Sequence, residues 1–238
     1  MKTSTKFLIA YIFLALTTTL VMFILSKKLL PEVDQSDFLQ QKSALPPFSV
    51  IVAMGNTEFH IEGAETNSLM WKVSKKDPNK WYKPKFFVQN DTLFVQKTDS
   101  SLSFNNRMVI SSKSLKAVVT THRDNVELRK LNREALLIQN TKSQVVINNW
   151  YDEKYKHLQK VVDLTVEATD SSEMTFYNVK IGKFSARLSH YSEYTSREYV
   201  SIGVAEVKLS DHSTATFEKA PFDLRMVRDS SSWSNIWR

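Results

Sequence analysis

A six-residue block recurs six times in the second half of the chain, and no other feature constrains the fold as strongly. The sixth residue of every block is apolar or aromatic, and the fourth is Ser in all but the first block, which has Asp. Successive blocks begin 19, 29, 20, 21 and 18 residues apart. They occupy residues 121–126, 140–145, 169–174, 189–194, 210–215 and 228–233.

A period near twenty residues, in which a polar corner separates two short strands, is typical of a β-solenoid. A single coil of this kind buries its apolar face only by stacking on the next coil. We therefore predict an all-β, right-handed β-solenoid (β-helix-like) domain over residues 48–238. The fourth positions would form a column of hydroxyl groups that bond to turn backbone or to each other: Ser143, Ser172, Ser192, Ser213 and Ser231. A β-sandwich with serine-rich turns is the alternative.

Alternating apolar residues also predict strands before the repeats, at 49–53, 58–61, 86–88 and 92–96. The segment Gln89-Asn90-Asp91 lies between the last two and is expected to form a hairpin turn, because Asn and Asp side chains bond to turn backbone.

An uncharged stretch of twenty residues at 7–26 is long enough to cross a bilayer as one helix. We predict that residues 1–28 are an N-terminal transmembrane anchor and that residues 29–47 are a linker ending at Pro46-Pro47. The domain that follows would then lie outside the cytoplasm, as a single-pass inner-membrane protein with a periplasmic C-terminal domain. A cleaved signal peptide, which would give a secreted domain, is the alternative.

The composition excludes several classes of function. The chain has no cysteine, which rules out disulfides, thiolate zinc sites, iron–sulfur clusters and a lipid anchor on cysteine. Its 4 glycines are too few for dinucleotide or P-loop phosphate cradles. The five histidines show no metal-ligand spacing, and no G-x-S-x-G nucleophile motif is present. We therefore expect no cofactor and no metal.

The recurring corner resembles the S-G-A-S-D-V corner of the putative autotransporter adhesin head domain, or GIN domain, found in envelopes of Bacteroidetes. The blocks 189–194 and 169–174 carry the resemblance best, and it extends over the whole predicted domain. It implies a β-solenoid surface domain without assigned catalytic residues. The family's Gly-Ala pair is replaced here by pairs such as His190-Tyr191 and Asp211-His212, which puts the glycine-dependent backbone angles of the corner in doubt.

A basic aromatic segment at 71–85 is the first candidate binding site, with six lysines against a single Asp. Lysines beside aromatic rings could contact anionic lipid headgroups or acidic glycans, although a solvated loop has the same composition. The residues concerned are Lys72, Lys75, Lys76, Lys80, Trp81, Tyr82, Lys83 and Lys85.

The longest step between blocks contains an insertion with Trp150 and Tyr151, which is the second candidate binding site. Loops on a rigid scaffold often carry binding residues, but an insertion is also tolerated where it has no role.

The second positions of four blocks give an acidic column with one imidazole: Asp170, His190, Asp211 and Asp229. Stacked carboxylates could divide acid and base roles as in enzymes that cleave polysaccharides. Asp is also common in tight turns through hydrogen bonds to backbone, without any further role.

These features favour a membrane-anchored, non-enzymatic module of the bacterial cell envelope, adhesin-like or structural. Its expected partners are the membrane, through the N-terminal helix, and an anionic glycan, a lipid headgroup or another envelope protein, whereas nucleic acid is not expected. The alternative is a carbohydrate-active enzyme that uses the Asp/His column.

Overall fold

The computed structural model describes residues 15–19, 38–75, 84–96, 108–148, 159–197 and 199–236. The chain divides into two compact units, Met1–Leu39 and Gln40–Arg238. Residues 15–19 of the first unit are helical, and most of the predicted anchor at 7–26 lies outside the described residues. Among the residues that are described, no helix has the length and apolar character needed to cross a membrane.

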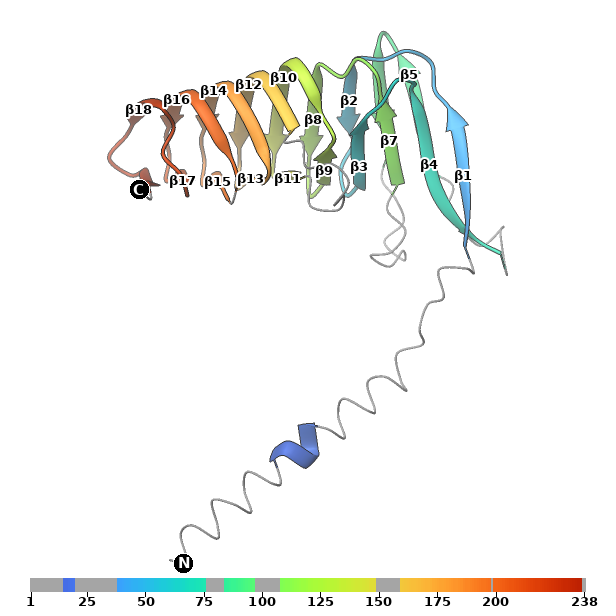
Figure 1. Ribbon diagram of the computed structural model, residues 1–238, viewed down its shortest axis with the longest axis horizontal. Helices are drawn as coiled ribbons and strands as arrows, with labels where there is room; N and C mark the ends of the chain where they lie inside the picture. The colour runs from blue at the N-terminus through green and yellow to red at the C-terminus, as the bar shows by residue number, and fades with distance from the viewer. Residues whose placement is uncertain are drawn as a thin grey trace, which may run out of the picture. The chain divides into compact units, whose positions relative to one another are not determined.

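The second unit is all-β, as predicted, and its described strands form two large sheets (Figure 1). In spatial order, the first sheet, sheet A, contains β1 (Phe38–Ala44), β4 (Ser68–Ser74), β7 (Met108–Ser112), β3 (Glu58–Gly63), β9 (Asn125–Arg129), β11 (Gln144–Ile147), β13 (Glu173–Phe176), β15 (Glu193–Ser196), β17 (Thr214–Phe217) and β19 (Trp233–Ile236). The second, sheet B, contains β18 (Asp223–Arg228), β16 (Ser201–Leu209), β14 (Val179–Leu188), β12 (Gln159–Thr169), β10 (Asn132–Thr141), β8 (Ala117–Thr121), β2 (Val50–Ala53), β6 (Thr92–Val95) and β5 (Phe86–Gln89). The strand β1 lies within the range that the sequence suggested to be a linker.

The chain alternates between the two sheets, and from β8 onward each strand pairs in parallel with the strand two places further along. Each coil therefore contributes one strand to each sheet and lies on the coil before it. Two antiparallel pairs, β4 with β7 and β5 with β6, occur at the start of the stack. The second is the hairpin predicted around Asn90, and both Asn90 and Asp91 have positive φ.

The first coils are not stacked in sequence order. The strand β2 pairs with β6 on one side and β8 on the other, and β3 likewise lies between β7 and β9. The coil formed by β6 and β7 therefore precedes the coil formed by β2 and β3 in space, although it follows it in sequence.

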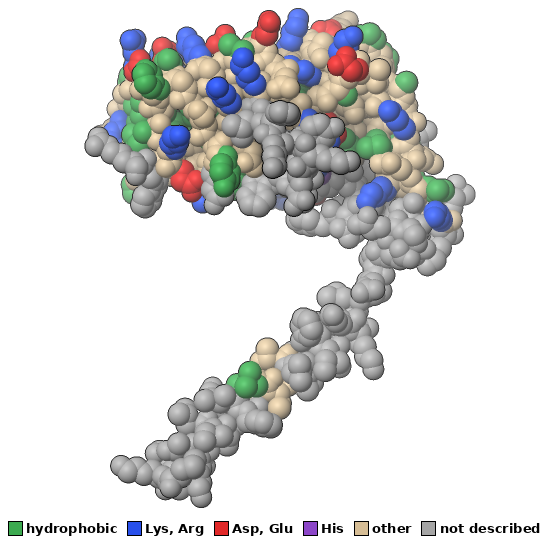
Figure 2. Space-filling view, viewed as in Figure 1, with side chains coloured by type: hydrophobic (Ala, Val, Ile, Leu, Met, Phe, Trp, Pro, Cys, Tyr) green, Lys and Arg blue, Asp and Glu red, His purple; other side chains and the backbone are tan. Residues whose placement is uncertain are grey.

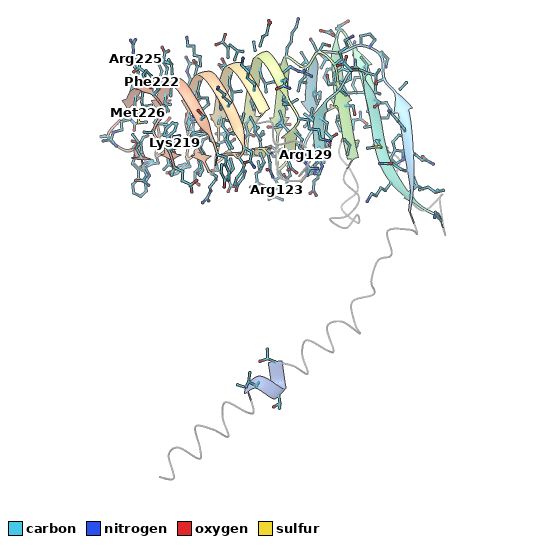
Figure 3. All side chains as sticks on the ribbon, viewed as in Figure 1. Arg123, Arg129, Lys219, Phe222, Arg225 and Met226 are labelled. Carbon is cyan, nitrogen blue, oxygen red and sulfur yellow. The ribbon has the colours of Figure 1, made fainter. Side chains whose placement is uncertain are left out.

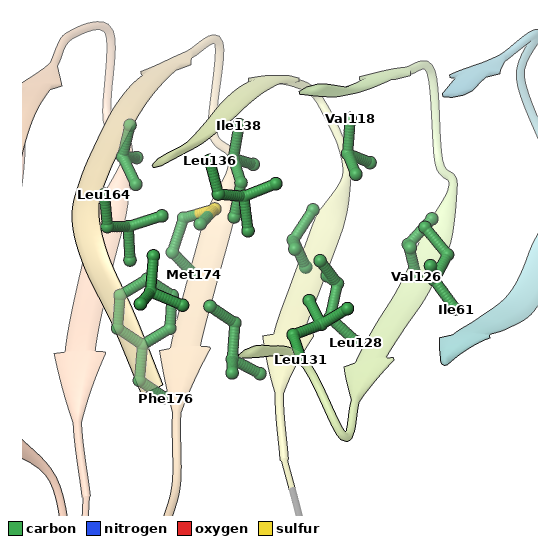
Figure 4. Close-up of a cluster of buried hydrophobic side chains, with 14 of the residues drawn as sticks. Ile61, Val118, Val126, Leu128, Leu131, Leu136, Ile138, Leu164, Met174 and Phe176 are labelled. Carbon is green, nitrogen blue, oxygen red and sulfur yellow. The ribbon is translucent and has the colours of Figure 1, made fainter. Parts of the chain in front are cut away.

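The core lies between the sheets, where the sixth positions of successive blocks are stacked on each other. Val126, Val145, Met174, Tyr194 and Ala215 occupy equivalent register positions and are at most 1% exposed. Figure 4 shows the middle of this core, where side chains from both sheets pack together. Towards the C-terminal end the core is aromatic, because Tyr194 contacts Phe176, Phe184 and Phe217 with ring centroids 4.8–5.2 Å away.

The strands of sheet B bend at one aligned row of residues, where the pairing register skips Glu134, Val162, Gly182 and Gly203. Two consecutive residues face away from the core at this bend, as Gly182 and Lys183 do in β14. A Cβ atom on Gly203 would lie 2.6 Å from the carbonyl oxygen of Gly182. At Gly203 the bend thus brings β16 closer to β14 than a side chain allows.

Candidate functional site

The polar corners of the repeats lie along one edge of the stack, between each strand of sheet B and the following strand of sheet A. We call this row the corner edge; Arg123 marks it in Figure 3. Coil-to-coil hydrogen bonds hold its backbone, for example from Ser171 N to His190 O at 2.7 Å and from Tyr191 N to Asp211 O at 2.9 Å.

The two central residues of four corners have left-handed backbone angles, although none of them is glycine. Their φ values lie between 51° and 63°. The pairs are His122 with Arg123, Asp170 with Ser171, His190 with Tyr191, and Asp211 with His212. The corners therefore adopt a left-handed backbone without glycine, and Arg123, Tyr191 and His212 are exposed on them.

The fourth positions form a buried column, as predicted for Ser143, Ser172, Ser192 and Ser213. Their hydroxyl groups bond to the backbone of the corner: Ser192 Oγ donates to Ser189 O at 2.6 Å and Ser213 Oγ donates to Ser210 O at 2.7 Å. In the last coil the buried residue is Ser232 and not Ser231, because Trp233 pairs with Thr214.

Asp124 takes the place of Ser in the first corner and is also buried. Its carboxylate accepts hydrogen bonds from Thr57 N, Thr57 Oγ1 and Thr121 N at 2.7–2.9 Å. Burial raises the pKa of Asp124, and these hydrogen bonds partly offset the effect. The carboxylate thus ties the corner of β8 and β9 to the preceding coil.

Asp170, His190 and Asp211 lie at aligned positions of three successive corners. His190 Nε2 is 3.8 Å from Asp211 Oδ2, and His190 Nδ1 is 3.4 Å from Thr169 Oγ1. His190 and Asp211 are both exposed, so this row is a surface feature and not a closed pocket.

The register places Asp229 one residue before this row, at the position of Ser210 in the preceding coil. Its carboxylate accepts hydrogen bonds from Asp211 N at 2.7 Å, Ser231 N at 3.1 Å and Ser231 Oγ at 2.9 Å. The nearby Ser232 hydroxyl and the hydrogen bonds from Asp211 and Ser231 favour the ionised carboxylate and lower the pKa of Asp229. Asp229 therefore supports the last corner and does not extend the row of acids.

The third positions of two corners form an aromatic stack that the sequence reading did not single out. The rings of Tyr191 and His212 are parallel within 9°, with centroids 5.1 Å apart, and the Tyr191 side chain is 62% exposed. Aromatic residues at the same position of adjacent blocks were the available signal, because equivalent positions of stacked coils are about 4.8 Å apart.

Three of the eight candidate binding residues in the basic aromatic segment are described: Lys72 on β4, which is half-buried, and the exposed Lys75 and Lys85. Five others lie outside the described residues: Lys76, Lys80, Trp81, Tyr82 and Lys83. Trp150 and Tyr151 also lie outside them.

A buried charged cluster on sheet A was not anticipated from the sequence. His60 on β3 and Glu127 on β9 are 8% and 7% exposed, with His60 Nε2 3.2 Å from Glu127 Oε2. Arg129, labelled in Figure 3, donates to the same carboxylate oxygen at 2.6 Å. Since the neighbours Phe59, Ile61, Val126 and Leu128 face the core, alternation places this cluster on the other side of the sheet.

The outer face of sheet B carries charges of both signs (Figure 2). A shallow hollow of about 190 Å³ lies on it, lined by Thr165, Glu167, Ser185, Arg187, Glu206 and Lys208. In the described ranges, no group of three or more His, Asp or Glu side chains is arranged to hold a metal ion.

The fold is similar to solved structures of putative adhesins from bacteria. A putative adhesin from Parabacteroides distasonis superposes with a TM-score of 0.56 at 13% identity, covering 84% of this chain and 93% of that one. Putative adhesins from Bacteroides fragilis and Parabacteroides merdae give TM-scores of 0.54 and 0.53, at 10% and 15% identity. They cover 84% and 86% of this chain and 95% and 98% of their own.

No protein-family model matches the sequence, and no curated protein matches it. At these identities the likeness to the three structures establishes the fold alone.

Proposed function

We propose that the chain is a non-enzymatic, adhesin-like binding module of the bacterial cell envelope. The observation that carries this proposal is the fold likeness to three adhesin structures, which extends over nearly their whole length. The corner edge supports it further, because a rigid row of exposed side chains on a stacked scaffold is suited to binding.

We infer that the two sheets form a right-handed β-solenoid related to the GIN domain. The alternation of strands between parallel sheets and the buried column of hydroxyl groups support this interpretation. The corners differ from the GIN pattern in having side chains where that family has Gly and Ala.

The apolar stretch at 7–26 is proposed to anchor the module in the inner membrane, with residues 40–238 outside the cytoplasm. The experiment is fractionation of bacteria that produce the full chain or a variant lacking residues 1–28. We expect the full chain in the membrane fraction, degraded by external protease only after the outer membrane is opened. A full-length chain in the soluble fraction would contradict the anchor, and a mature chain beginning near residue 30 would establish a cleaved signal.

The basic aromatic segment is proposed to contact an anionic glycan, a lipid headgroup or an acidic envelope protein, because Lys75 and Lys85 are exposed beside four further lysines in sequence. Attraction between exposed charges is screened within about 8 Å at physiological ionic strength. Binding to an anionic polysaccharide should therefore weaken with salt and with replacement of Lys75, Lys76, Lys80 and Lys83 by Ser.

A carbohydrate-active enzyme is the second candidate, favoured by the approach of His190 to Asp211. Asp229 accepts hydrogen bonds from the Asp211 backbone and the Ser231 hydroxyl, so one of the four residues that this mechanism would use is already engaged. Turnover of a polysaccharide that is lost in Asp211→Asn while binding is unchanged would favour this candidate.

A further inference from the structure

The corner edge carries side chains at positions where they are unfavourable for the backbone. The left-handed conformation costs a non-glycine residue about 1–2 kcal/mol, and glycine would avoid the cost. At two adjacent corners the chain nevertheless has His190-Tyr191 and Asp211-His212. Strained residues of this kind concentrate at ligand-binding sites, so these side chains are candidates for contact with a ligand.

One face of the Tyr191 ring is covered by His212 and the opposite face is turned towards the preceding coils. The residue aligned with Tyr191 in the preceding coil is Ser171, because Glu173 pairs with Glu193. In the coil before that, Thr141 pairs with Thr169 and Ser143 aligns with Ser172. Only Lys142 lies between them, so this corner is one residue shorter than the corner at Ser171. A small side chain and a shorter corner thus leave room beside the free face of Tyr191, and its 62% exposure agrees with this.

The spacing of the coils suits the stacking of a six-membered sugar ring on Tyr191. Coils are about 4.8 Å apart, so a ring placed above Ser171 would continue the stack that His212 and Tyr191 begin. The flat, apolar C–H face of a pyranose can pack on an aromatic ring, and tyrosine offers such a surface with little loss of conformational entropy.

Polar groups that suit sugar hydroxyls are present on the same and the neighbouring corners. Asp170 is beside Ser171 in sequence, and the imidazole of His190 lies between Thr169 Oγ1 at 3.4 Å and Asp211 Oδ2 at 3.8 Å. Together they supply hydroxyl, carboxylate and imidazole groups that donate and accept hydrogen bonds. The carboxylates of Asp170 and Asp211 would repel an acidic sugar, which favours a neutral one.

We propose that Tyr191, Ser171, Asp170 and His190 bind a neutral hexopyranose ring of a glycan, with His212 positioning the Tyr191 ring from behind. This inference rests on the proposed binding function and specifies one site and ligand class for it. The site is separate from the basic aromatic segment, which would contact anionic ligands.

The test is binding of the full chain, in a detergent without a sugar headgroup, to neutral hexasaccharides of glucose, mannose and N-acetylglucosamine. We expect at least one to bind, and Tyr191→Ala to weaken its Kd by about tenfold or more, as for an aromatic residue at the centre of a contact. Ser171→Tyr, which fills the space, should weaken binding comparably without removing the ring. Tyr199→Ala is the matched control, because Tyr199 is 71% exposed and lies outside the corner edge; its Kd should change less than about twofold.

Circular dichroism and thermal melting would establish that both site variants are folded. Binding that Tyr191→Ala and Ser171→Tyr leave unchanged would overturn the proposed site while leaving the binding module intact. Failure to bind any of the neutral sugars would overturn it too, including a result in which only an anionic polysaccharide or an aromatic peptide binds. Cleavage of a bound sugar would instead contradict the non-enzymatic function and keep the site.

Discussion

Individual residues on the corner edge combine two roles, because the same side chains that face solvent also sit on a strained backbone. Arg123 is exposed, has a φ of 63°, and lies two coils away from Ser171. It therefore offers a place to measure the strain without touching the proposed sugar site.

We predict that Arg123→Gly raises the free energy of unfolding by about 0.5–1 kcal/mol. Relief of the left-handed conformation stabilises the folded chain by about 1–2 kcal/mol. The greater conformational freedom of glycine in the unfolded chain offsets about 0.5–1 kcal/mol of this. Arg123→Ala is the control, because it removes the same side chain and keeps the strain. Equal effects of Gly and Ala in denaturant unfolding would show that the backbone at this corner is not strained.

Asp229 stabilises the last corner through its ionised form, which gives stability a defined pH dependence. Its pKa in the folded chain lies below the ordinary value of 3.8, because the nearby Ser232 hydroxyl and the hydrogen bonds from Asp211 and Ser231 favour the carboxylate. A lowered pKa contributes stability that is complete above the unfolded value and is lost as the pH falls through the folded value.

We predict that Asp229→Asn lowers the melting temperature at pH 7, and that the difference from the wild type shrinks below about pH 4. Melting curves of both chains between pH 2 and 7 would measure this. Asp211→Asn is the control, because the Asp211 backbone N–H and not its side chain donates to Asp229. A difference that is constant over this range would mean that ionisation of Asp229 has no role.

At the scale of the strands, the stack depends on how closely successive coils approach at the bend in sheet B. We predict that Gly203→Ala lowers the free energy of unfolding by about 1–3 kcal/mol, since the added Cβ meets a backbone oxygen that cannot move independently of its strand. Ser201→Ala, on the exposed side of the same strand, should change stability by less than about 0.5 kcal/mol. Equal stability of the two variants in chemical denaturation would contradict the close packing.

The repeats could be predicted from the sequence because the same buried position recurs in each coil. Ser143, Ser172, Ser192 and Ser213 are aligned as expected, since each fills the same space behind a corner. The last corner was misaligned by one residue because Ser230, Ser231 and Ser232 are chemically equal, and only the pairing of Trp233 with Thr214 distinguishes them.

Other features of the elements left no local signal. The shorter corner at Lys142 could not be predicted, because Asn140 was aligned with the first, polar position of the other blocks. In the structure the Asn140 side chain is buried, and its Nδ2 donates to Ser143 O and Glu173 O. The placement of β2 between β6 and β8 is a long-range pairing that alternation of apolar residues does not encode. The Tyr191–His212 stack required the register before its two rings could be recognised as neighbours.

For the whole molecule, we propose that residues 40–238 form a scaffold whose exposed side chains bind a ligand without cleaving it. The paired sheets hold the corners in place. On the corner edge, Asp124 and Asp229 accept hydrogen bonds from backbone groups, whereas His190 and Asp211 are open to solvent.

The most direct measurement is equilibrium dialysis of the full chain against neutral oligosaccharides, followed by mass spectrometry of the ligand after prolonged incubation. We predict saturable binding that depends on Tyr191, and we expect the oligosaccharide to be recovered at its original mass. Shortened products whose formation is abolished in Asp211→Asn would contradict this prediction.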